Sequence, residues 1–92
     1  MSSSPAPAAR LRVVQRHDCE LCERMLSELA ALGGRVTLPP IEVVDVDSDS
    51  ELLRRHGLEV PVLLLDGTVV CRHRLDAAEL VRLLRPPPAS RA

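Results

Sequence analysis

Residues 11–22 read LRVVQRHDCELC, a short apolar run followed by two cysteines three positions apart. Residues 11–15 are typical of a β-strand, and the polar residues behind them end it. A stripe of apolar residues at helical spacing begins inside the pair, with Cys22, Met25, Leu26, Leu29 and Leu32. The sequence therefore predicts that Cys19 lies between a strand and a helix, and that Cys22 lies on the buried face of that helix.

The next segment predicts a second strand and a short second helix. Gly33-Gly34 ends the first helix, and residues 41–46 are rich in valine, as a buried strand is. Ser48 and Glu51 form a capping box, and Gly57 closes the helix behind it. The first part of the chain thus has the order β-α-β-α.

The remaining residues predict a hairpin and a last helix. Residues 60–65 are continuously apolar, which is typical of a strand buried on both faces, and Asp66-Gly67 is a strong turn signal before a strand over residues 68–72. Asp76 and Glu79 form a second capping pair. We expect an α/β fold in the order β-α-β-α-β-β-α. Its four-stranded mixed sheet has the first two strands parallel, the last two antiparallel, and helices on both faces.

The chain of 92 residues is long enough for one small domain. Residues 1–10 consist mainly of Ser, Pro and Ala, and residues 86–92 include three consecutive prolines. Such segments bury too little surface to offset the entropy of ordering. We expect disordered tails at 1–10 and 86–92 around a domain of residues 11–85.

Composition argues against several classes of partner. The chain has 12 basic and 13 acidic residues and no Phe, Tyr or Trp, so it offers nucleic acid neither positive charge nor a stacking surface. Its longest apolar run, residues 60–65, is far shorter than the about 20 residues of a membrane span, and residues 1–9 lack the features of a secretory signal. We expect a cytoplasmic monomer without nucleic-acid or membrane partners.

The predicted junction makes the two thiols inequivalent. Cys19 would lie among unpaired backbone N–H groups at the positive end of the helix dipole, which favours a thiolate, whereas desolvation keeps Cys22 neutral. A dithiol oxidoreductase uses one exposed attacking sulfur and one shielded resolving sulfur. The same spacing also chelates metals or occurs in structural thiols, and we favour the redox interpretation.

Neighbouring charges predict only modest acidification of Cys19. Arg16 and His17 would stabilise its thiolate, whereas Asp18, Glu20 and Glu23 oppose it. We therefore do not expect a strongly oxidising dithiol. His17 could also orient partners, although a solvated loop residue is the simpler interpretation, and His56 would complement the C-terminal dipole of the second helix.

The third cysteine leaves alternatives open. An antiparallel last strand could bring Cys71 and His73 near the pair, so that Cys19, Cys22, Cys71 and His73 form a Cys₃His zinc site in a non-catalytic binding or interaction domain. Cys71 could also be a third redox thiol. We favour a half-buried apolar role for Cys71 and an exposed His73, and assign no metal.

The motifs resemble the thioredoxin superfamily, and in particular the short glutaredoxin-like proteins. The resemblance rests on residues 14–22, on residues 43–47, and on Val60-Pro61-Val62-Leu63 with Asp66-Gly67, and it extends over residues 11–84. It implies a thioredoxin-like fold and a cis peptide bond before Pro61 beside the cysteines. It also implies that the backbone of Val60 pairs with substrate.

Two features of glutaredoxins are missing here: an aromatic residue between the cysteines and a Gly-Gly pair late in the fourth strand, where this chain has Cys71-Arg72. Arg72 and Arg74 could still pair with glutathione carboxylates, and Asp76 could accept its amine. A solvated face with an N-cap is the plainer interpretation. We expect no bound cofactor and keep glutathione as a candidate co-substrate.

Together these features predict a small thiol–disulfide oxidoreductase. Cys19 would attack a disulfide of a protein or of a glutathione adduct, Cys22 would resolve the mixed disulfide, and Val60 and Pro61 would orient the substrate.

Overall fold

The computed structural model describes residues 9–85. Its elements in chain order are β1 (Leu11–Gln15), α1 (Glu20–Gly33), β2 (Ile41–Asp45), a 3₁₀ turn η1 (Val46–Ser48), α2 (Ser50–His56), β3 (Val62–Leu65), β4 (Thr68–Arg72) and α3 (Ala77–Leu84). The expected tails lie outside the described residues except for Ala9 and Arg10. Arg10 is hydrogen bonded with Asp66, donating its N–H to Oδ1 at 3.0 Å and accepting the Asp66 N–H at 2.9 Å.

The four strands form one mixed sheet in the order β2-β1-β3-β4. β1 runs parallel to β2 and antiparallel to β3, and β3 runs antiparallel to β4. The predicted element order and strand directions are therefore confirmed. No helix in the described part of the chain is long and apolar enough to cross a membrane.

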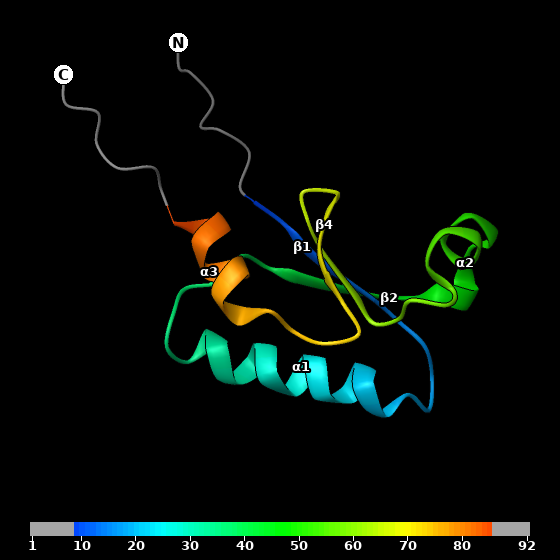
Figure 1. Cartoon of the computed structure of the whole chain (residues 1–92), viewed down its shortest axis with the longest axis horizontal. Coiled ribbons are helices and arrows are strands. Elements are labelled where there is room, and N and C mark those ends of the chain that lie inside the picture. Colours follow the sequence, from blue (N-terminus) through cyan, green and yellow to red (C-terminus); the bar gives the residue numbers. More distant parts are fainter. Residues whose placement is uncertain (1–8, 86–92) are drawn as a thin grey trace, which may run out of the picture.

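Helices cover both faces of the sheet (Figure 1). On one face, α1 and α3 pack over the sheet in a cluster formed by Leu11, Val13, Met25, Leu29, Leu32, Leu63 and Leu80. On the other face, a smaller cluster of Val14, Val46 and Val62 packs against Leu52 of α2. Neighbouring residues in β1 and β3 point to opposite faces, so Val13 and Val14 enter different clusters, as do Val62 and Leu63.

The expectation that residues 41–46 form a buried strand is wrong in two respects. β2 is an edge strand with β1 as its neighbour, so Ile41 and Val43 remain exposed. It ends at Asp45, and Val46 lies in η1, where its side chain is fully buried. Valine-rich composition fits a half-buried edge as well as a central strand.

The start of α2 also differs from the expectation. Asp49, not Ser48, is the N-cap, and its Oδ1 accepts a hydrogen bond from the N–H of Glu51 at 2.7 Å. The Ser48 hydroxyl instead donates to the Asp45 carbonyl oxygen at 2.7 Å. Gly57 ends α2 as predicted, with its N–H donating to the Leu53 carbonyl oxygen at 2.8 Å.

The third strand starts later than predicted. β3 begins at Val62, because Pro61 has no N–H to contribute to the sheet. Val62 and Leu63 are fully buried on opposite faces, whereas Leu64 and Leu65 are half-buried. Residues 60 and 61 are therefore left in the loop between α2 and β3.

Candidate active site

Strand register brings four distant segments to one edge of the sheet. Gln15 at the end of β1 pairs with Asp45 at the end of β2, and Val14 pairs with Val62 at the start of β3. Val62 in turn pairs with Arg72 at the end of β4. The cysteine segment, the acidic segment after β2, the loop before β3 and the loop after β4 therefore all leave the sheet at this edge.

Cys19 is the N-cap of α1. Its backbone is extended, with φ −120° and ψ 108°, and its carbonyl oxygen accepts the N–H of Glu23 at 3.0 Å. Its Sγ accepts the N–H of Cys22 at 3.1 Å. Asp18 directly before it has a left-handed φ of 53°, which Asp tolerates better than most residues, and this turns the chain from β1 into α1. The sulfur therefore lies at the start of α1 and accepts one of the N–H groups that lack a partner within the helix.

The two cysteines differ in exposure as the helical spacing predicts. Cys22 is fully buried, and Cys19 is partly exposed. Their Cα atoms are 5.2 Å apart and their sulfurs are at disulfide-bonding distance. One sulfur is thus accessible from solvent while its partner is shielded by the core.

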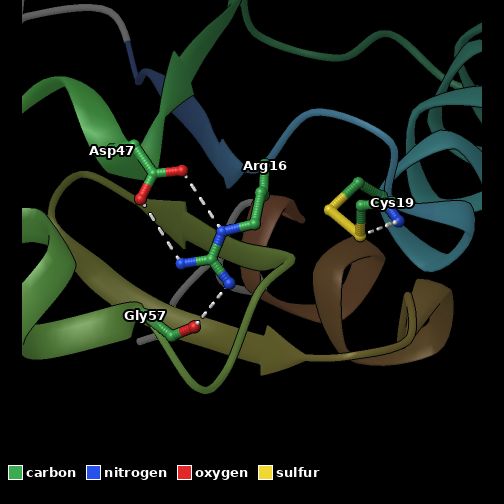
Figure 2. The surroundings of a disulfide bond; sticks show 5 residues. Arg16, Cys19, Asp47 and Gly57 are labelled. Carbon is green, nitrogen blue, oxygen red and sulfur yellow. Dashed lines mark hydrogen bonds and ion pairs between the residues drawn. A yellow bond between two sulfur atoms is a disulfide. The ribbon is translucent and has the colours of Figure 1, made fainter.

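The two basic residues expected to act on Cys19 are paired with other residues. Arg16 Nε lies 3.3 Å from Asp47 Oδ2, and His17 Nε2 lies 3.3 Å from Asp45 Oδ2. In Figure 2, the Arg16 guanidinium points away from the disulfide, toward Asp47 and Gly57. We expected Arg16 and His17 to stabilise the Cys19 thiolate. Instead, the structure pairs Arg16 with Asp47 and His17 with Asp45.

The loop before β3 has an open backbone position. The Val60–Pro61 peptide bond is cis, and the Pro61 carbonyl oxygen accepts the N–H of His73 at 2.8 Å. Within residues 9–85, no hydrogen bond involves the backbone of Val60. Val60 packs against the smaller core cluster. Its backbone groups are therefore available at the same sheet edge as Cys19.

An acidic residue in this loop binds Arg72. Arg72 Nε donates to Glu59 Oε1 at 3.0 Å, and His56 Nδ1, buried and without a hydrogen-bond partner in the described residues, lies 3.6 Å from the same oxygen. The hydrogen bond from Arg72 holds the pKa of the Glu59 carboxyl below its ordinary value. Arg72 is thus occupied by a neighbour within the fold.

The other two residues considered for glutathione lie on the chain between β4 and α3. The Arg74 N–H donates to the Arg72 carbonyl oxygen at 2.7 Å, and the Arg74 side chain is exposed. Asp76 is the N-cap of α3, and its Oδ1 accepts the N–H of Glu79 at 3.0 Å. The predicted cap is therefore confirmed.

The structure does not group the Cys₃His residues of the zinc alternative. Cys71 packs against the larger core cluster, on the face covered by α1 and α3, and its Sγ accepts the N–H of Asp76 at 3.4 Å. Burial raises the pKa of the Cys71 thiol. His73 is exposed and has a left-handed φ of 68°. Within residues 9–85, no three His, Cys, Asp or Glu side chains are grouped so that they could hold a metal.

Three residues of this edge were not identified from the sequence: Asp47, Gly57 and Glu59. Asp47 could have been found, because parallel pairing of the first two strands places the residues after them side by side and Arg16 is an obvious counter-charge. The Gly57 contact has no such signal, since a backbone carbonyl leaves no trace in residue identity.

The family model of the glutaredoxin-like domain matches residues 10–85. No curated protein matches the sequence significantly. The solution structure of protein Ne2328 from Nitrosomonas europaea is 27% identical and has a TM-score of 0.76. The match covers 91% of this chain and 100% of that one.

Two further structures resemble the chain. Target protein XcR50 from X. campestris is 30% identical, with a TM-score of 0.57 and coverage of 80% of this chain and 93% of that chain. Oxidised thioredoxin from Plasmodium falciparum shares the fold at 19% identity, with a TM-score of 0.55 and coverage of 83% and 77%. Since the family model spans all but one of the described residues, this chain belongs to the glutaredoxin-like domain family and has a thioredoxin-like fold.

Proposed function

We propose that the protein is a thiol–disulfide oxidoreductase that reduces disulfides of proteins or of glutathione adducts. The observation that carries this proposal is the pair of unequal sulfurs at the start of α1. Cys19 is partly exposed and accepts the N–H of Cys22, and Cys22 is fully buried. A disulfide can therefore reach one sulfur directly, and the second sulfur is held within bonding distance of the first.

The first step is attack by the Cys19 thiolate on one sulfur of the substrate disulfide. A bond forms between Cys19 Sγ and that sulfur, and the other substrate sulfur leaves as a thiolate that takes up a proton. The N–H of Cys22 and the dipole of α1 favour negative charge on Cys19. The open backbone of Val60 can pair with an extended substrate chain beside it.

The second step releases the substrate. Cys22 loses its proton and attacks Cys19 Sγ, which forms the internal disulfide and expels the remaining substrate sulfur as a thiolate. In total the substrate gains two electrons and two protons, and the Cys19–Cys22 dithiol loses them. A thiol donor then reduces the internal disulfide, and glutathione is our candidate.

Alkylation mass spectrometry and turnover assays on the same preparation test this proposal. The reduced protein should lose two alkylatable thiols, Cys19 and Cys22, when it meets a disulfide substrate, and regain them with a thiol donor. Cys19→Ser should abolish turnover, whereas Cys22→Ser should accumulate a mixed disulfide on Cys19. Cys71→Ser is the matched control and should retain turnover.

Turnover is measured with insulin disulfides and with a glutathione-coupled disulfide assay. Activity in either assay that depends on Cys19 supports the proposal. Absence of activity in both assays, or full activity of Cys19→Ser, would contradict it and would favour an interaction domain that keeps the fold without the chemistry.

A further inference from the structure

Arg16 joins the segment that carries Cys19 to the loop that carries Val60. It follows β1 directly and lies three positions before Cys19. Its Nη1 donates to the Gly57 carbonyl oxygen at 3.1 Å, in a partly buried contact. Its Nε and Nη2 donate to the two carboxylate oxygens of Asp47 at 3.3 and 3.5 Å. Figure 2 shows the guanidinium spanning these two partners and directed away from Cys19.

The carbonyl that receives Arg16 is firmly placed. Gly57 is buried at the end of α2, and a Cβ added there would lie 2.5 Å from the Leu53 carbonyl oxygen. The last carbonyls of a helix lack partners within the helix and carry its negative partial charge. The Arg16 guanidinium therefore provides a hydrogen-bond donor for the Gly57 carbonyl oxygen, and its positive charge complements the negative end of the α2 dipole.

Other contacts fix the far half of the same loop from β4. Arg72 binds the carboxylate of Glu59, and the His73 N–H donates to the Pro61 carbonyl oxygen. Leu58, between the anchored residues 57 and 59, is 96% exposed. The loop between α2 and β3 is thus held by residues that follow β4 or end it, and by Arg16, which follows β1 and precedes the cysteines.

We propose that Arg16 is a positioning residue, which sets where the Val60 backbone lies relative to Cys19 Sγ and so governs recognition of an extended disulfide-bearing polypeptide. This inference rests on the proposed oxidoreductase function. It assigns Arg16 a mechanical role through Gly57 in place of a charge effect on the thiolate. The rigid fork of arginine makes both contacts at once, which the point charge of lysine cannot reproduce fully.

The proposal predicts a split between two kinds of substrate. A peptide disulfide needs both Cys19 and the Val60 backbone, so loss of Arg16 should raise its KM by about tenfold, as expected for a hydrogen bond to a charged group. Bis(2-hydroxyethyl) disulfide has no peptide backbone, so its reduction needs the two cysteines but not the Val60 backbone. Its turnover should stay within about twofold, since no interaction of about 1 kcal/mol or more is lost.

Arg16→Gln is the main variant, and Arg12→Gln is its matched control. Arg12 lies near the start of β1, whereas Arg16 follows the end of this strand, and Arg12 makes an exposed ion pair with Glu42 at 3.0 Å. Arg16→Lys should recover part of the loss, because it keeps the charge beside Asp47. Asp47→Asn retains Arg16 but removes its ionic partner, and it replaces Arg16→Gln if that variant does not fold.

Kinetics separate the outcomes when the wild-type protein turns over. A higher peptide KM in Arg16→Gln, with unchanged turnover of bis(2-hydroxyethyl) disulfide and an unchanged pH profile of Cys19 alkylation, supports the proposal. An unchanged peptide KM would overturn it. A shifted alkylation profile would also overturn it, since it would show that Arg16 acts on the thiolate.

Amide hydrogen exchange tests the inference without relying on turnover. Arg16→Gln should speed exchange of the Gly57 and Glu59 amides, which donate to the Leu53 and His56 carbonyl oxygens, at least about tenfold relative to Arg12→Gln, because the loop loses an anchor. Equal exchange in the two variants would overturn the inference. If the wild-type protein reduces neither substrate, the proposed function fails, and exchange still decides whether Arg16 positions the loop.

Discussion

The backbone N–H of Cys22 donates a hydrogen bond to the Sγ of Cys19 over 3.1 Å. The contact occurs because Cys19 is the N-cap of α1, and an N-cap side chain accepts from an N–H of the first turn. An anionic sulfur accepts such a bond more strongly than a neutral one. The local fold of α1 is therefore coupled directly to the reactivity of Cys19.

This contact predicts a moderately reactive thiolate. The helix start favours the anion, whereas Glu20 and Glu23 in the first turn of α1 oppose it. In reduced protein, the midpoint of the pH profile for Cys19 alkylation by iodoacetamide should lie below the about 8.5 of a free cysteine and above about 4. Replacing both glutamates by Gln should lower the midpoint by about half a unit.

Glu28→Gln is the control for this experiment, since it removes one negative charge from α1 more than one turn beyond Glu23. It should leave the midpoint unchanged, because the influence of a charge on the helix terminus falls off within one turn. A midpoint below about 4, or an equal shift in Glu28→Gln, would refute the balance of charges argued here.

Cys71 should behave as a structural thiol. Burial raises its pKa, so a smaller fraction is thiolate at neutral pH than in a free cysteine. Its sulfur also accepts the Asp76 N–H at the start of α3. Limited alkylation near pH 7, read by mass spectrometry, should label Cys19 before Cys71. Faster labelling of Cys71 would contradict this assignment.

Local patterns explain why much of the fold was predictable. The Cys22 stripe, the Asp66-Gly67 turn and the Asp76 cap each depend on residues within about one helical turn or one hairpin. The structure has each of them where the pattern indicated. A strand-to-helix junction at Cys19 follows from the same local information.

The features that could not be predicted from the sequence depend on residues that are distant in the chain and close in space. Whether a valine-rich strand is central or at an edge is decided by its partners, and residues 41–45 carry no record of them. The partners of Arg16 lie 31 and 41 residues away. The sequence likewise did not show that Cys71 packs against the larger core cluster, or that no three possible metal ligands are grouped within residues 9–85.

The ion pair of Glu59 with Arg72 predicts an acid-sensitive contact. Because Arg72 lowers the carboxyl pKa in the folded protein, the pair stabilises the fold above the ordinary pKa of Glu, and this contribution is lost as the pH falls through the lowered value. Since Glu59 is solvent-screened, the effect on unfolding should be small. The carboxyl carbon of Glu59, followed by NMR, should titrate below an ordinary Glu and return toward it in Arg72→Gln.

Arg82→Gln is the matched control for that titration. Arg82 makes an equivalent exposed pair with Glu79 at 2.7 Å and likewise lowers the pKa of its partner. This variant should shift the titration of Glu79 and leave that of Glu59 unchanged. If Arg72→Gln leaves the Glu59 titration where it was, the pair does not form in solution.

Among the glycines at the ends of α1 and α2, we expect Gly57 to lose the most stability when it is replaced by alanine. A Cβ at Gly57 would lie 2.5 Å from the Leu53 carbonyl oxygen. Outside the backbone of its own helix, the nearest atom to a Cβ at Gly33 lies in the Leu38 side chain at an ordinary 3.6 Å. Backbone must move to relieve the first contact, so Gly57→Ala should lower the free energy of unfolding by about 1–3 kcal/mol. Gly33→Ala replaces the last residue of α1 by a better helix former, and it should be neutral or stabilise by up to about 1 kcal/mol. Urea unfolding of both variants measures the difference in the free energy of unfolding. If Gly57→Ala is as stable as Gly33→Ala, the end of α2 is free to move. The Gly57 carbonyl would then not be the fixed acceptor that the role of Arg16 requires.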